Sequence, residues 1–90
     1  MPNVEARRLI HSRHYCTDRL VEVKDELARI QAEDLELKDR LDGVEETEAG
    51  QIRRRRRHLS RRVNELKAER AALMVELQES TDKLKMIHQP

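Results

Sequence analysis

The chain has 90 residues, enough for one small domain, and 41% of its residues are charged. It has no Phe or Trp, one Tyr and two Gly, so it lacks the aromatic and turn residues typical of a β-sheet fold. A single cysteine excludes an internal disulfide, and no apolar run is long enough for a signal sequence or a membrane span. Abundant Leu, Ala, Glu, Lys and Arg are typical of long helices and coiled coils. We therefore expect a soluble, cytoplasmic, all-α protein.

The net charge of +1 conceals an uneven distribution of charge along the chain. Residues 20–50 hold eleven acidic residues and four basic ones, whereas residues 51–70 hold nine Lys or Arg and two Glu. An acidic block that is followed by a basic block of equal size suggests that the two halves neutralise each other.

Apolar residues recur every seven residues in both halves of the chain. We letter this repeat a to g, with Leu20 at a and Val23 at d in the first half, and Val63 at a and Leu66 at d in the second. Each half sustains the repeat over about five heptads, which is enough to predict an amphipathic helix with a coiled-coil seam. The expected helices cover about residues 3–42 and about residues 49–88.

The two repeats are out of phase by one residue, and the slip falls within LDGVEETEAGQ, residues 41–51. Gly43 can end the first helix in a left-handed conformation. The second helix can start at Thr47, or at Asp42 with Glu45 three residues later. We therefore predict a turn at about residues 43–48 that joins the helices into an antiparallel helical hairpin, which is a two-helix coiled coil. The hairpin is expected to form a single domain over 1–90. One continuous helix with a skip in its repeat is the alternative.

An antiparallel hairpin aligns the two repeats in eleven layers, seven of which are apolar on both sides. The only layer that is polar on both sides pairs Arg13 with Ser80. Asp34 lies one layer from Arg56, so we expect a diagonal ion pair within the seam. Polar contacts in a seam lower stability but can fix the register.

Charged residues at the g positions support the same alignment. The antiparallel register places five oppositely charged pairs across the two helices: Glu33–Arg55, Glu26–Arg62, Arg19–Glu69, Arg40–Glu48 and Glu5–Lys83. Each exposed pair contributes only ~0.2–1 kcal/mol, so these pairs mainly select the antiparallel arrangement.

A second apolar stripe lies beside the seam, which suggests that each helix has more than one neighbour. We expect it to mediate homodimerisation of two hairpins into a four-helix bundle. The stripe could instead receive a helix from another protein. Its residues are Val21, Ala28 and Leu35 in the first helix and Ala71, Met74 and Val75 in the second.

The arginine run in QIRRRRRHLSRR, residues 51–62, has two interpretations. Arg55, Arg56 and Arg62 fall in the seam or beside it. The others point outward and form either a solvated face or a ridge that binds phosphates in a salt-sensitive, sequence-independent manner. The absence of aromatic residues argues against stacking on single strands. The candidate polyanion-binding residues are Arg53, Arg54, Arg57 and Arg61.

A metal site and an enzymatic function are not expected. His11 and His14 are three residues apart rather than four, and Cys16 falls at a d position in the seam. His58 and His88 complete no ligand set. No phosphate-binding loop, activated nucleophile or paired catalytic carboxylates are present, so no cofactor or small-molecule substrate is expected. We expect a protein-interaction module of the adaptor, scaffold or inhibitor type, or alternatively a nonspecific DNA- or RNA-binding protein.

Overall fold

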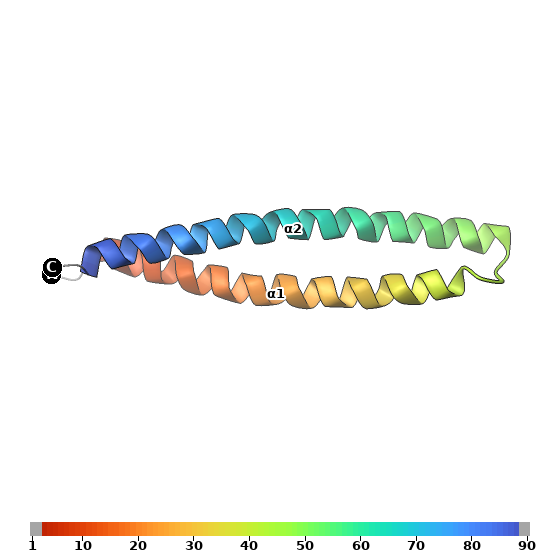
Figure 1. The fold of residues 1–90 in the computed structure, drawn as a ribbon, viewed down its shortest axis with the longest axis horizontal. Coiled ribbons are helices and arrows are strands. Elements are labelled where there is room, and N and C mark those ends of the chain that lie inside the picture. The colour runs from red at the N-terminus through yellow and green to blue at the C-terminus, as the bar shows by residue number, and fades with distance from the viewer. Residues whose placement is uncertain (1–2, 89–90) are drawn as a thin grey trace. The chain divides into compact units, whose positions relative to one another are not determined.

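A computed structural model describes residues 3–88 of the chain. It contains two helices, α1 (Val4–Arg40) and α2 (Glu46–His88), and no strand among the described residues. The two helices run in opposite directions and are joined by residues 41–45 (Figure 1). The predicted all-α helical hairpin is confirmed, and the alternative of one continuous helix is wrong.

Asn3 caps the start of α1. The side-chain oxygen Oδ1 of Asn3 accepts a hydrogen bond of 3.2 Å from the backbone N–H of Ala6. The backbone carbonyl of Asn3 accepts a second bond of 3.2 Å from the N–H of Arg7. Asn3 is therefore the N-cap, because its side chain satisfies a backbone donor that has no partner within the helix.

The turn follows from Gly43, which has a φ of 84°. This left-handed conformation ends helices and favours glycine, so the predicted role of Gly43 is confirmed. The helix boundaries differ from the expected ones, because α1 ends at Arg40 rather than near residue 42 and α2 begins at Glu46 rather than near residue 49. The backbone carbonyl of Glu45 accepts a 2.8 Å bond from the N–H of Ala49, so Thr47 lies inside the first turn and is not the start of α2.

Alanine substitution should change stability in opposite directions at the two glycines. Gly50 lies within α2, and a Cβ there would meet nothing within 4 Å, so Gly50→Ala should raise the free energy of unfolding by about 0.5–1 kcal/mol. Gly43→Ala should lower it by about 1 kcal/mol, because alanine is strained at positive φ. Urea unfolding followed by circular dichroism measures both changes. Equal effects of the two substitutions would contradict this account of the turn.

The chain divides into two compact units, and both helices contribute to each. We call residues 24–68 the turn unit. We call residues 1–23 with 69–90 the terminal unit, and residues 1–2 and 89–90, the ends of the expected domain, lie outside the described residues.

The core of the turn unit is built mainly from the d positions of the predicted repeat. They are buried in both helices, whereas Leu27 and Val63 at a positions are only half-buried. Burial is therefore unequal between the two kinds of seam position, which leaves one edge of this seam open. The buried apolar residues of the turn unit are Ile30, Leu37, Ala49, Ile52, Leu59 and Leu66.

The core of the terminal unit contains Cys16, Val23, Leu73 and Leu84, together with one buried polar residue, Ser80. The prediction that Ser80 meets Arg13 is wrong. Arg13 is exposed, and the Ser80 hydroxyl donates a 3.4 Å hydrogen bond to the hydroxyl of Ser12. A small hydroxyl that has a hydrogen-bond partner is less costly to bury than a guanidinium. This explains why Ser12, and not Arg13, lies against Ser80.

Candidate interaction surfaces

Ion pairs close one edge of the seam in the turn unit. Arg55 Nε lies 2.6 Å from Glu33 Oε2, and Arg62 Nε lies 2.6 Å from Glu26 Oε2. Both arginines add a second hydrogen bond to the same carboxylate, which makes each pair bidentate. Nearer the turn, Arg40 Nη2 lies 3.1 Å from Glu48 Oε1. These three predicted pairs are confirmed.

In the terminal unit, Arg19 and Glu69 form a bidentate pair, with Nε and Oε2 2.5 Å apart. The pKa of Arg19 is raised, mainly by its hydrogen bond to Glu69, so this guanidinium stays charged. The fifth predicted pair is wrong, because Glu5 and Lys83 make no ion pair among the described residues.

One contact in the terminal unit was not predicted. The Ser12 hydroxyl donates a 3.0 Å hydrogen bond to Oε1 of Glu76. Both residues occupy g positions and have the same spacing as the charged pairs. The signal was therefore present in the repeat, but a search for opposite charges does not find a hydroxyl.

The predicted diagonal pair between Asp34 and Arg56 is confirmed, with Arg56 Nε 2.9 Å from Asp34 Oδ1. This ion pair spans the open edge of the turn unit, and the side chains of both Asp34 and Arg56 remain partly exposed. The hydrogen bond from Arg56 lowers the pKa of Asp34, and the hydrogen bond from Arg55 likewise lowers the pKa of Glu33.

These lowered pKa values predict a loss of stability in acid. Folding lowers the pKa of Glu33 below its ordinary value of 4.5 and the pKa of Asp34 below its ordinary value of 3.8. The stabilisation from these carboxylates is therefore fully present above their ordinary pKa values and is lost as the pH falls from there through the lowered pKa values of the folded state. Thermal unfolding between pH 6 and pH 3 should show a falling midpoint, and Glu33→Gln should reduce the fall. Glu36→Gln is the control, because Glu36 is exposed and makes no ion pair among residues 3–88. An equal reduction by both variants would contradict the assignment.

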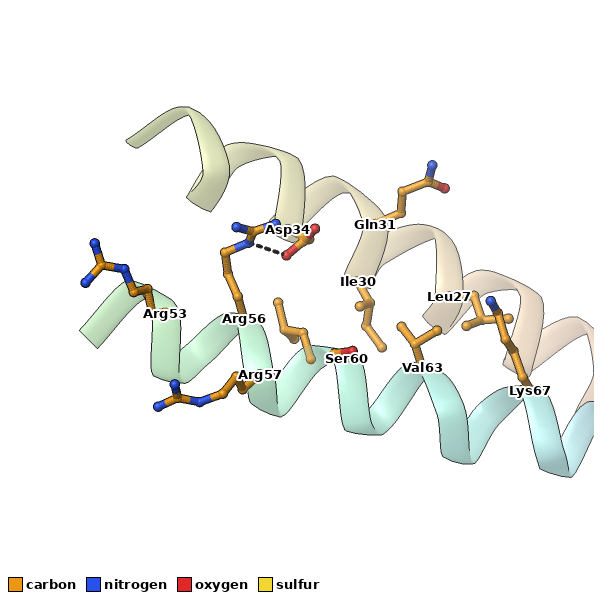
Figure 2. Close-up of a pocket in the computed structure, with 11 residues that line it drawn as sticks. Leu27, Ile30, Gln31, Asp34, Arg53, Arg56, Arg57, Ser60, Val63 and Lys67 are labelled. Carbon is orange, nitrogen blue, oxygen red and sulfur yellow. Dashed lines mark hydrogen bonds and ion pairs between the residues drawn. The ribbon is translucent and has the colours of Figure 1, made fainter. Parts of the chain in front are cut away.

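The opposite edge of the turn unit opens into a groove of about 790 Å³. Its apolar part consists of Leu27, Ile30, Leu59 and Val63. Ile30 and Val63 point toward one another between the helices (Figure 2). We call this feature the basic groove because of its polar lining, which consists of Gln31 and Asp34 from α1 and Arg53, Arg56, Arg57, Ser60 and Lys67 from α2.

The lining of the basic groove is strongly positive. It holds four cationic side chains but only one acid, Asp34, which is already paired with Arg56. Arg57 and Lys67 make no ion pair among the described residues, and Arg53 reaches Glu46 at 3.4 Å. Arg57 extends away from α1, and neither Arg53 nor Arg57 points toward Asp34 (Figure 2). An unpaired positive charge therefore lies beside an apolar surface that is only partly covered.

The predicted polyanion-binding residues are all exposed on α2. Arg54, Arg57 and Arg61 have no ion-pair partner among residues 3–88, so a phosphate could reach all three. Arg53 differs from them because it contacts Glu46. The other three arginines of the run, Arg55, Arg56 and Arg62, pair with acids of α1, as predicted.

The predicted association stripe is exposed, but its residues are divided between the two units. The terminal unit holds Val21, Ala71, Met74 and Val75, and the turn unit holds Ala28 and Leu35. Of eight large hydrophobic side chains that are exposed in the described chain, only Leu35 belongs to the turn unit. The other seven, all in the terminal unit, are Val4, Ile10, Tyr15, Val21, Met74, Val75 and Met86.

The histidines and the cysteine form no candidate metal site. Residues 3–88 contain no group of three or more His, Cys, Asp or Glu side chains placed to hold an ion. Cys16 is buried, and its thiol pKa is raised, mainly by burial and further by the Glu76 carboxylate. A raised pKa keeps the thiol protonated, which makes it a poor ligand and a poor nucleophile.

The structure thus defines an all-α helical hairpin with a basic groove in one unit and exposed apolar side chains in the other. Neither α1 nor α2 contains a segment sufficiently long and apolar to traverse a bilayer, within the part of the chain that the structure describes. No family model, curated protein or solved structure matches the chain.

Proposed function

We propose that this chain is a non-enzymatic coiled-coil module that acts through helix–helix contacts and forms a homodimer through its terminal unit. The observation that carries the proposal is the concentration of exposed hydrophobic side chains in that unit. Of these side chains, Ile10, Val21 and Met74 occupy b and e positions, beside the seam, and apolar residues that gather on one side of a helix pair mark a surface that packs against another molecule. A dimer of hairpins would complete a four-helix bundle.

Part of the terminal unit is suited to packing against a second copy. The stripe residues Val21, Ala71 and Met74 share the a, b and e positions with the uncharged residues Thr17, Leu20, Leu77, Gln78 and Thr81, while basic residues occupy other a and b positions of this unit, namely Arg7, Arg13, Arg70 and Lys85. A twofold-symmetric interface centred on the uncharged residues would keep these four basic side chains apart and so limit like-charge repulsion. The single cysteine, which has no partner for an internal disulfide, accords with a cytoplasmic location.

Light scattering on the full chain tests self-association, with the expected mass being twice the 10.7 kDa of one chain. Ala71→Glu should weaken dimerisation at least about tenfold, because it places a charge in the apolar contact. Ala72→Glu is the matched control, since it makes the same change at an exposed neighbouring residue off the stripe. A monomeric chain, or equal effects of the two variants, would refute the proposal.

A second candidate function is sequence-independent binding of DNA or RNA phosphates. It is favoured by Arg54, Arg57 and Arg61, which are exposed and have no acidic partner among the described residues. Such binding would weaken steeply with salt, because it depends on released counterions. A mobility-shift titration at two salt concentrations tests it, with reversal of all three arginines to Glu as the variant. Absence of a shift at low salt would exclude this function.

A further inference from the structure

We infer that the basic groove of the turn unit binds an amphipathic helix with acidic edges from another protein, and not a second copy of this chain. The inference rests on the proposed role in helix–helix contacts and names a partner for a surface that homodimerisation through the terminal unit leaves unused. Three observations carry it: the open edge of the seam, the sign of its charges and the length of the groove.

The open edge has the form of an incomplete helix packing. On the closed edge, Glu26–Arg62 and Glu33–Arg55 bridge the seam and leave a smaller hollow, of about 380 Å³, between them. On the open edge the a-position residues Leu27 and Val63 remain half-buried. A third helix could bury them by placing its own apolar residues, spaced three and four apart, between α1 and α2.

The charge of the groove selects the partner. Arg57 and Lys67 line it without an ion-pair partner in the described chain, and its only acid, Asp34, is occupied by Arg56. A second copy that packed with the same face would bring like charges together, which opposes association. A helix with glutamate or aspartate beside its apolar stripe would instead supply the missing acids. The aliphatic floor of Leu27, Ile30, Leu59 and Val63 favours such a helix over nucleic acid, because phosphates gain nothing from aliphatic contact.

The dimensions of the groove set the length of the bound segment. On α2 the lining extends from Arg53 to Lys67, which spans about 21 Å at ~1.5 Å per residue. A helix of about four turns would cover this distance.

The test uses fluorescence anisotropy at about 150 mM salt, where charges more than ~8 Å apart are largely screened. The probe is a labelled, synthetic four-turn helical peptide with Leu at a and d and Glu at e and g, added to the full chain. Two comparison peptides replace either all Glu by Lys or all Leu by Ser. We expect the Glu–Leu peptide to bind and both comparison peptides to bind at least about tenfold more weakly.

Matched variants locate the contact. Arg57→Glu with Lys67→Glu should weaken binding of the Glu–Leu peptide at least about tenfold. Arg54→Glu with Arg61→Glu makes the same change of charge at exposed residues outside the groove, and should alter binding less than about twofold. Circular dichroism of the variants shows whether the hairpin is still folded.

Several results would overturn the inference. Failure of the Glu–Leu peptide to bind would refute it, as would equal loss of binding in the two double variants. Equal binding of the Ser peptide would show a general polyanion surface. Light scattering with and without peptide separates this inference from the proposed homodimer. A monomeric chain that binds the peptide would refute only the proposed homodimer. A dimeric chain that does not bind the peptide would refute only the proposed role of the basic groove. A dimer that dissociates when the peptide binds would show that a second copy occupies the groove.

Discussion

Leu66→Ala should lower the free energy of unfolding by about 2–5 kcal/mol. The Leu66 side chain is 0% exposed, so its truncation leaves a cavity in the core of the turn unit and removes apolar contacts. Few neighbours can move into this space, because long helices that pack along one seam cannot collapse locally without shifting along their length. Urea unfolding followed by circular dichroism at 222 nm measures the change.

Leu35→Ala is the matched control for this prediction. Leu35 lies in the same unit but is 56% exposed, so the same substitution should change stability by less than about 0.5 kcal/mol. Comparable losses for Leu35→Ala and Leu66→Ala would mean that the seam does not dominate the stability of the hairpin.

The thiol of Cys16 should react with a disulfide reagent at least about 100-fold more slowly in the native chain than in the chain unfolded by urea. Cys16 is 0% exposed, and its raised pKa suppresses the reactive thiolate. Modification therefore requires local or global opening, and each 1.4 kcal/mol of opening free energy slows it about tenfold. Absorbance of the released thiol product gives both rates.

Moving the thiol by one residue provides the control. In the double variant Cys16→Ser/Thr17→Cys, the cysteine occupies an exposed position on the same turn of α1. It should react almost as fast in the native chain as in urea. Native-state rates that are equal for Cys16 and for the displaced cysteine would show that the core of the terminal unit is not closed.

Much of the hairpin could be predicted from the sequence, because its determinants are local and periodic. Gly43 reveals the end of α1 since few other residues adopt a positive φ readily. The seven-residue spacing of Glu26 and Glu33 against Arg62 and Arg55 fixes direction and register together. These features depend only on which residues recur and at what interval.

Other features could not be predicted, because they depend on how each helix is rotated about its own axis. A heptad treats a and d positions as equivalent, yet Ile30 and Leu59 are buried while Leu27 and Val63 are half-buried. The basic groove arises from this difference. The same lack of rotational information led to Arg13, rather than Ser12, being expected opposite Ser80 in the terminal unit.

The charges at the closed edge of the turn unit change sign along each helix, and this order has a consequence for alignment. Along α1, the charge at this edge changes from negative at Glu33 to positive at Arg40. Along α2, it changes from negative at Glu48 to positive at Arg55. Sliding the helices by one heptad in one direction would set Arg40 against Arg55, and sliding them in the other would set Glu33 against Glu48. Heptad-spaced apolar residues alone would tolerate both shifts. The order of the charges along the two helices therefore favours one alignment over its neighbours, whatever the length of the connection between them.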